Sequence, residues 1–209
     1  MSVSFVPMEV SLVGSMGDDD SVVNAARVSF AKSADAYSQA QNDSLLAFLA
    51  REGHWSPFAH TAITVRCKVP LFLAAQLKKH QVGLTWNEVS RRYVTTDIEF
   101  LAPPTFHLAP SNKKQGRGEP APPEMQEDLA DQWRVRCCSS KKTYDYYVAK
   151  GCAPEELRAL LPQATMTEFV WTGSIMAFVR VIEQRSSEGA QLIAQEFAAL
   201  LHSAIKDVY

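Results

Sequence analysis

The chain has 209 residues, of which 46% are hydrophobic and 21% are charged, and its formal net charge is −2. These proportions are typical of a folded globular protein, and the slight negative charge argues against a non-specific nucleic-acid binder, which is usually basic. No apolar run approaches the roughly 18 residues that a membrane helix needs, and the first ten residues lack the regions of a signal peptide. We therefore expect one domain over residues 1–209, located in the cytoplasm, without membrane or nucleic-acid partners.

The four cysteines stand at positions 67, 137, 138 and 152. None of them forms a Cys-x-x-Cys pair, and two adjacent cysteines suit neither a disulfide framework nor a zinc site. The sequence therefore predicts reduced thiols and no metal centre.

The first part of the chain predicts two strands and three helices. Residues 9–13 alternate as in a strand, and the aspartates at 18–20 can cap a short helix over 22–30. A second helix is expected over about 43–52, where Gly53 ends it. Residues 61–69 form the clearest strand, with the odd-numbered side chains on its apolar face, and Pro70 opens a third helix as its first residue.

The second part of the chain predicts mainly helices. Residues 97–103 have strand character, and 103–123 contain six prolines and two glycines and are interpreted as a surface loop. A long helix is expected over 124–150, followed by a short one that begins at Pro154. Residues 165–209 are interpreted as two helices with a break at 186–189. A few strands among many helices, without strict alternation, predict an α+β fold with helices packed on a small sheet.

The most polar stretch lies between two segments that look buried. QLKKHQVGLTWNEVSRRY, residues 76–93, carries polar side chains in nearly every helical register instead of on one side. Polar groups held between buried elements need partners, and a bound ligand is one way to supply them. A solvated helix end followed by a polar loop is the alternative interpretation.

This stretch resembles the signature of the flavin-dependent thymidylate synthases, an Arg-His-Arg triplet followed about eight residues later by a serine with an arginine soon after. The corresponding residues are KHQ at 79–81 and SRRY at 90–93, so both arginines of the triplet are replaced. Two further segments match the family, AARVSF at 25–30 and GHWSPFAH at 53–60. In the second of them Ser56 stands where the family has a threonine, and it keeps the hydroxyl group.

The resemblance implies C5 methylation of dUMP, with FAD as the cofactor and with NADPH and methylenetetrahydrofolate as co-substrates. In this chemistry the flavin carries out the redox step, and the protein supplies position and electrostatics. The resemblance also implies an α+β fold and a homotetramer with active sites built between subunits. Arg185 aligns with the family's uracil-activating arginine, and a planar guanidinium at the uracil carbonyl edge can stabilise developing negative charge.

The other site residues follow from the resemblance, position by position. The nucleotide is expected to contact Gln76, Lys79, Glu88, Val89, Ser90, Arg91, Arg92, Arg158 and Arg185, with Val89 and Arg91 contributing their backbones. FAD is expected to contact Ser56, Lys79, His80, Gln81 and Glu88, and the folate His54 and Tyr93. Ser90 and Arg92 are suited to the phosphate of the nucleotide.

Replacements on the cofactor side leave other activities open. Gln81 lacks the charge of the family's arginine, and Ser174, Arg180 and Gly189 stand where the family has asparagines and a histidine at the flavin. One alternative is a variant C5 methylase or hydroxymethylase that acts on UMP, dUMP or dCMP. The alternatives of another class are a nucleotide-binding protein without catalysis and a helix-turn-helix DNA-binding protein, which the acidic balance disfavours.

Overall fold

The computed structural model describes residues 3–111 and 116–208. Two short strands, β1 (Ser4–Val6) and β5 (Glu99–Leu101), pair in parallel and form a small sheet. The main sheet is antiparallel throughout, and its strand order is β2 (Glu9–Met16), β3 (Ala62–Pro70), β6 (Met166–Gly173) and β4 (Leu84–Glu88).

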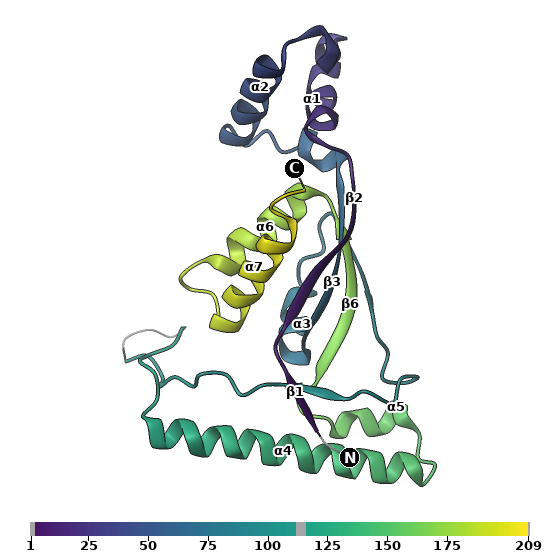
Figure 1. Cartoon of the computed structure of the whole chain (residues 1–209), viewed down its shortest axis with the longest axis vertical. Coiled ribbons are helices and arrows are strands. Elements are labelled where there is room, and N and C mark those ends of the chain that lie inside the picture. The colour runs from purple at the N-terminus through teal and green to yellow at the C-terminus, as the bar shows by residue number, and fades with distance from the viewer. Residues whose placement is uncertain (1–2, 112–115, 209) are drawn as a thin grey trace.

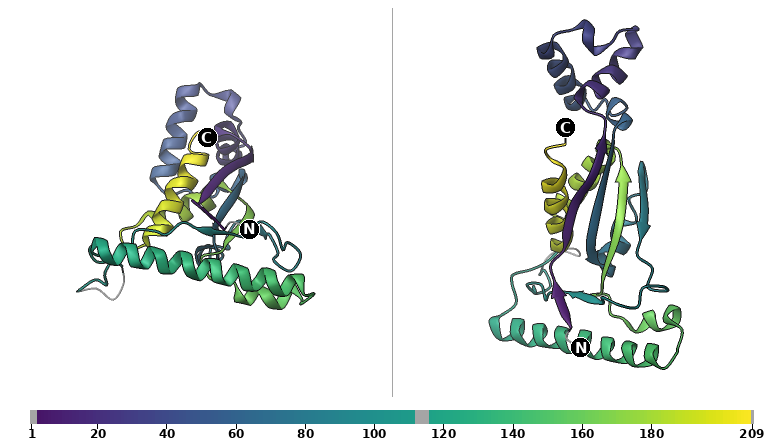
Figure 2. Two further views of the ribbon diagram at one scale, coloured as in Figure 1. Left: turned by 60° about the horizontal axis from the view of Figure 1, so that its bottom comes forward. Right: turned by 45° about the vertical axis from the view of Figure 1, so that its right-hand side comes forward.

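Helices cover one face and both ends of the main sheet. They are α1 (Asp19–Arg27), α2 (Gln39–Arg51), α3 (Leu71–Leu77), α4 (Pro123–Ala149), α5 (Pro154–Leu157), α6 (Ile175–Ser186) and α7 (Leu192–Ile205), with 3-10 turns at Val28–Phe30, Ala34–Ala36, Pro57–His60 and Arg158–Leu160. Figures 1 and 2 show α3, α6 and α7 against one face, α1 and α2 at one end, and α4 and α5 across the other. This arrangement confirms the predicted α+β fold.

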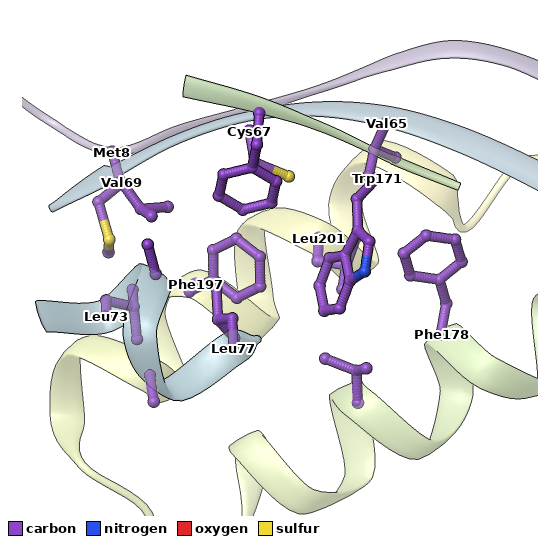
Figure 3. Close-up of a cluster of buried hydrophobic side chains, with 14 of the residues drawn as sticks. Met8, Val65, Cys67, Val69, Leu73, Leu77, Trp171, Phe178, Phe197 and Leu201 are labelled. Carbon is purple, nitrogen blue, oxygen red and sulfur yellow. The ribbon is translucent and has the colours of Figure 1, made fainter. Parts of the chain in front are cut away.

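The larger core lies between the main sheet and α3, α6 and α7. The odd-numbered side chains of residues 63–69 are fully buried there, as the period of two predicts. Trp171 of β6 is also fully buried, with Phe178 of α6 and Phe197 of α7 beside its ring (Figure 3). Burying a large apolar side chain contributes about 1.5–3 kcal/mol, so this layer holds the helices on the sheet.

A smaller core joins the two-stranded sheet to α4. Ile98 and Phe100 pack there with Cys137 and Tyr144 of α4. The apolar stripe predicted for α4 is only partly buried, because Met125 in the first turn remains 45% exposed. The C-terminal part of the helix is therefore the more deeply buried part, and apolar side chains of its first turns remain partly exposed at the surface.

Two strands of the main sheet differ from the sequence interpretation, and the short strand β1 was not predicted either. The sequence predicts a helix from residue 165 onward, but 166–173 form β6, next to the centre of the sheet. Phe169 and Trp171 point into the core and Val170 does not, so a period of two governs this segment. Residues 84–88, inside the polar stretch, form β4, which the sequence does not predict. Because this segment is a strand, the helix-turn-helix alternative is wrong.

The other predicted elements are confirmed, with shifted ends. Pro70 is the last residue of β3 and the N-cap of α3, with a ψ of 152°, instead of the first helical residue. The described part of the proline-rich segment before α4 holds no helix or strand, apart from an isolated bridge between His107 and Pro120. Across residues 3–111 and 116–208, the structure contains no helix of the length and apolarity that crossing a bilayer requires.

Candidate functional site

A cavity of about 1330 Å³ opens between α3, α4 and the connection from α6 to α7. Gln76 and Arg185, both expected at the site, line this cavity. The Oε1 atom of Gln76 is buried and has no hydrogen-bond partner among the described residues. A buried acceptor without a partner is costly, so a ligand that donates to this oxygen would be stabilised. Within residues 3–111 and 116–208, no group of three or more His, Cys, Asp or Glu side chains could hold a metal ion.

Arg185 contacts the segment that follows α3. Its Nε donates a hydrogen bond to Nε2 of His80 at 2.9 Å. The His80 ring lies edge-on to the buried Trp171, with 6.4 Å between the ring centroids. Burial and then the charge of Arg185 lower the pKa of His80, which keeps the imidazole neutral and able to accept. Since the guanidinium makes no other hydrogen bond within the described residues, its terminal NH2 groups remain available to a ligand.

The serine and arginine half of the signature lies elsewhere, in the loop after β4. This loop leaves the edge strand of the sheet and lies beside α5 in every view of Figures 1 and 2. The backbone N–H and the Nε of Arg92 both donate to Oγ of Ser90 at 3.4 Å. Tyr93 is 75% exposed. Arg158, directly after α5, is exposed and donates to the Glu155 carbonyl at 3.0 Å.

Arg91 gives this loop its shape. Its Nη1 donates to the carbonyl of Thr96 at 2.7 Å, and its Nη2 donates to the carbonyl of Asp97 at 3.2 Å. Asp97 has a φ of 52°, which is uncommon for a residue other than glycine, so the loop needs such support. The N–H of Val89 donates to the carbonyl of Glu168 at 2.9 Å, which ties the start of the loop to the sheet.

The carboxylate of Glu88 is satisfied inside the chain. One oxygen accepts from the Thr167 hydroxyl at 2.7 Å, and the other accepts from Nε1 of Trp86 at 3.2 Å. The second oxygen also forms an ion pair with Lys78. Glu88 therefore fixes β4 and the start of the loop, and it has fewer free lone pairs for a ligand than the sequence predicts.

Of the residues expected at the flavin, Ser56 and Gln81 lie near the first half of α6, whereas His80 contacts Arg185 in its last turn. Ser56 precedes the 3-10 turn at 57–60, and this turn packs against α6. On another side of the helix, Gln81 leads into Gly83, where an added Cβ would meet the Cβ of Ala177 at 3.4 Å. The side chains of Ser56 and Gln81 are exposed and make no hydrogen bond within the described residues.

The donors present there fit a flavin. A flavin offers ring carbonyls, ring nitrogens and phosphates as acceptors, and the hydroxyl of Ser56, the amide of Gln81 and the ammonium of Lys79 are free donors. A second cation lies on the side of Ser56. It is the guanidinium of Arg180, which is 5.7 Å from the ring centroid of the neighbouring Trp55. Sequence reasoning noted Arg180 only as a departure from the family pattern.

The two residues expected at the folate are not brought together within one chain. His54 lies between α2 and β3, with its ring edge-on to Phe48 at 5.6 Å between centroids. Tyr93 follows the opposite end of the sheet, since β3 begins near Gly173 and β4 ends beside Phe169. The predicted residues therefore form three separate groups, around the cavity, beside α5, and at the start of α6.

Comparisons with known proteins give one consistent result. The family profile described as Thymidylate synthase complementing protein matches residues 11–209. A flavin-dependent thymidylate synthase from Anaplasma marginale is 32% identical over 199 residues, which cover 94% of this chain and 67% of that relative. Another from Thermosipho africanus is 30% identical over 196 residues, which cover 94% of this chain and 85% of that relative.

A solved structure shares the fold. It is the UMP/dUMP methylase PolB from Streptomyces cacaoi bound with 5-Br dUMP, which is 25% identical, with a TM-score of 0.85. The match covers 98% of this chain and 93% of that chain. Together with the family profile and the two relatives, it shows that this chain belongs to the thymidylate synthase complementing protein family, the flavin-dependent thymidylate synthases.

Proposed function

We propose that this chain methylates C5 of a uridine nucleotide, dUMP in the first place, with bound FAD and with methylenetetrahydrofolate and NADPH as co-substrates. The observation that carries the proposal is the cavity lined by both Arg185, oriented by His80, and Gln76, whose buried Oε1 has no partner among the described residues. Relatives named flavin-dependent thymidylate synthase and a structure named UMP/dUMP methylase support it.

Uracil complements the two polar groups of the cavity. Its N3–H can donate to Oε1 of Gln76, and its carbonyl oxygens can accept from the guanidinium of Arg185. C5 becomes nucleophilic toward the one-carbon unit when the ring takes on enolate character, with negative charge on a carbonyl oxygen. The guanidinium would stabilise that charge until C5 gives it up in forming the new bond. Cytosine lacks the N3–H and would leave the Gln76 oxygen unpaired, so we expect uridine nucleotides to be preferred over dCMP.

The flavin site of this proposal uses Ser56, Lys79, His80 and Gln81. When bound, a reduced flavin supplies the hydride that converts the transferred carbon into a methyl group, and NADPH restores the reduced form. The protein residues hold and orient the partners. His80 connects the two functions, because it follows Lys79 in the chain and also fixes Arg185 at the cavity.

We also propose a homotetramer whose active sites are shared between subunits. Ser90, Arg92 and Arg158 are expected at the phosphate, but they do not line the cavity that contains Gln76 and Arg185. A second subunit that brings its loop after β4 to this cavity would complete the nucleotide site. Exposed apolar side chains offer surface for such contacts, and Phe30 is 78% exposed.

The same proposal covers domain organisation and location. Residues 1–209 would act as one catalytic domain, because Trp133 packs against both hydrophobic cores and joins them. All four cysteines are free, which agrees with a reducing compartment such as the cytoplasm.

Mass spectrometry of the reaction products tests the proposed function. The purified protein is incubated with FAD, NADPH and methylenetetrahydrofolate, and with dUMP, UMP or dCMP in separate reactions. We expect a product from dUMP whose mass has increased by one CH2 unit, and little or none from dCMP. A gain of CH2O would instead identify a hydroxymethylase. The absence of any product from the three nucleotides, with flavin bound, would contradict the proposal.

A further inference from the structure

We infer that the cavity contains a second, anion-binding subsite built by Arg136 of α4 and Arg117 of the proline-rich segment. This inference rests on the proposed function, because it concerns a substrate of that reaction bound in the cavity that Gln76 and Arg185 line. The ligand group is an anion on that molecule. It is either the phosphate of the nucleotide or the glutamate carboxylates of the folate, and the experiment below distinguishes these sources.

The wall that carries this subsite is a built structure. Gln126 of α4 ties down the proline-rich segment, because its Nε2 donates to the Phe106 carbonyl at 2.6 Å and its Oε1 accepts from the Phe106 N–H at 2.9 Å. The Phe106 ring lies edge-on to the ring of Trp133, with 6.1 Å between centroids. The indole N–H of Trp133 donates to the Leu101 carbonyl at 2.9 Å. The aromatic wall is therefore fixed from both sides.

The charges in the cavity favour an anion. Arg117, Arg136 and Arg185 line it, together with Glu196. Arg117 and Arg136 are exposed to the cavity and its mouth, and neither forms a hydrogen bond or ion pair within residues 3–111 and 116–208. Three guanidinium groups against one carboxylate give the cavity a positive potential, which attracts an anion.

The size and lining of the cavity indicate a ligand that extends beyond a pyrimidine ring. Ligand pockets in proteins are typically about 300–1,000 Å³, and this cavity of about 1330 Å³ is larger. All of these residues line one cavity, but Trp133 and Arg136 come from α4 and Phe106 from the proline-rich segment, whereas Gln76 and Arg185 come from α3 and α6. A molecule with a polar ring at one end and an anion at the other matches this distribution.

Equilibrium binding to the FAD-loaded protein tests the subsite, with Arg136→Gln as the variant. The matched control is Arg134→Gln, because Arg134 lies on the same helix but pairs with Asp131 at 3.1 Å and does not line this cavity. The four probes are dUMP, deoxyuridine, tetrahydrofolate monoglutamate and tetrahydrofolate triglutamate. Because Arg136→Gln loses one charge-assisted hydrogen bond, the Kd of the probe whose anion occupies the subsite should rise about tenfold. The control should bind all four probes like the wild type.

Each outcome is informative. If dUMP weakens while deoxyuridine does not, the subsite binds phosphate. If the triglutamate loses its advantage over the monoglutamate, the subsite binds the folate tail. If Arg136→Gln and also Arg117→Gln bind all four probes as the wild type does, the subsite does not exist, and the proposed function still stands. If the wild type binds neither a nucleotide nor a folate, the proposed function and the subsite both fail.

Discussion

The two halves of the polar stretch are positioned in opposite ways. His80 follows α3, lies against the buried Trp171, and accepts from Arg185 at 2.9 Å. In the loop at 90–93, Arg92 and Tyr93 are exposed and Arg91 is half-buried, and the side chain of Arg91 shapes the loop by donating to its carbonyls. The first half is therefore held by the main core, whereas the second half is held by its own hydrogen bonds.

This difference indicates a division of roles. A group held by the core is preorganised, as stabilisation of developing charge requires. A loop that keeps its own shape can present a phosphate site and still meet a partner subunit. Changes in the first half should therefore act mainly on kcat, and changes in the second half mainly on the KM of the nucleotide.

The largest effect is expected for Arg185→Ala. Removing a donor that stabilises transition-state charge typically lowers kcat by about 10²–10³-fold. Among the described residues that line the cavity, His80 orients no other guanidinium. FAD content should remain, since Arg185 is not among the expected flavin residues. Steady-state kinetics and the visible spectrum check both expectations, with Arg134→Ala as the control. Wild-type turnover in Arg185→Ala would show that another residue activates the pyrimidine.

A smaller effect, on binding, is expected for Arg91→Ala. Without the hydrogen bonds to Thr96 and Asp97 the loop loses its shape, so the KM for dUMP should rise about tenfold while kcat changes little. Arg91→Lys should recover part of the affinity, because an ammonium can still reach one carbonyl. A fall in kcat at unchanged KM would contradict the assigned role, and thermal unfolding of each variant controls for loss of stability.

A still smaller effect is expected on the pH dependence of turnover. Burial and Arg185 lower the pKa of His80 from its ordinary value of 6.5, so His80 keeps accepting from Arg185 until the pH falls to that lowered pKa. Below the lowered pKa the protonated ring cannot accept, and turnover should decrease. The acid limb of kcat should therefore lie below pH 6.5, and it should disappear in His80→Gln. A limb at or above that pH would mean that another group controls it.

The smallest effect is expected at the flavin. Lys79→Arg combined with Gln81→Arg restores the family triplet, and the second change adds a charged fork where only an amide is present. We expect FAD to bind about three- to tenfold more tightly in the double variant. Fluorescence titration of both proteins measures this. Equal or weaker affinity would indicate that Arg180, above the Trp55 ring, already supplies the missing charge.

Local patterns in the sequence predicted much of the fold. Alternation in 61–69 gave β3 its two faces, and the caps around α1 and α2 gave those helices. The pattern of 166–173 was misinterpreted because this strand is flanked by helical segments and carries apolar residues on adjacent positions. Its assignment depends on pairing with β3 and β4 across the chain, which no single segment reveals.

The site was predictable in its residue types but not in its geometry. The contact between His80 and Arg185 joins positions 105 residues apart, and only the tertiary fold brings the last turn of α6 to the segment after α3. Arg91 was expected to contribute its backbone, and nothing local indicates that its side chain shapes the loop. Arg136 was not predicted at all, because a surface arginine on a long helix gives no signal until the cavity is seen.

Mixing two variants that are each impaired at a low dUMP concentration tests the central claim most directly, since the two halves of the signature are proposed to meet between subunits. One variant is Arg185→Ala, which lacks the cavity group, and the other combines Ser90→Ala with Arg92→Ala, which lacks the loop groups. Co-expressed subunits with different tags are purified as mixed oligomers and assayed with dUMP. If each site takes its cavity and its loop from different subunits at random, about a quarter of the sites are intact and turnover returns to about that fraction. Mixed oligomers that are no more active than the two parents would show that both halves act within one chain.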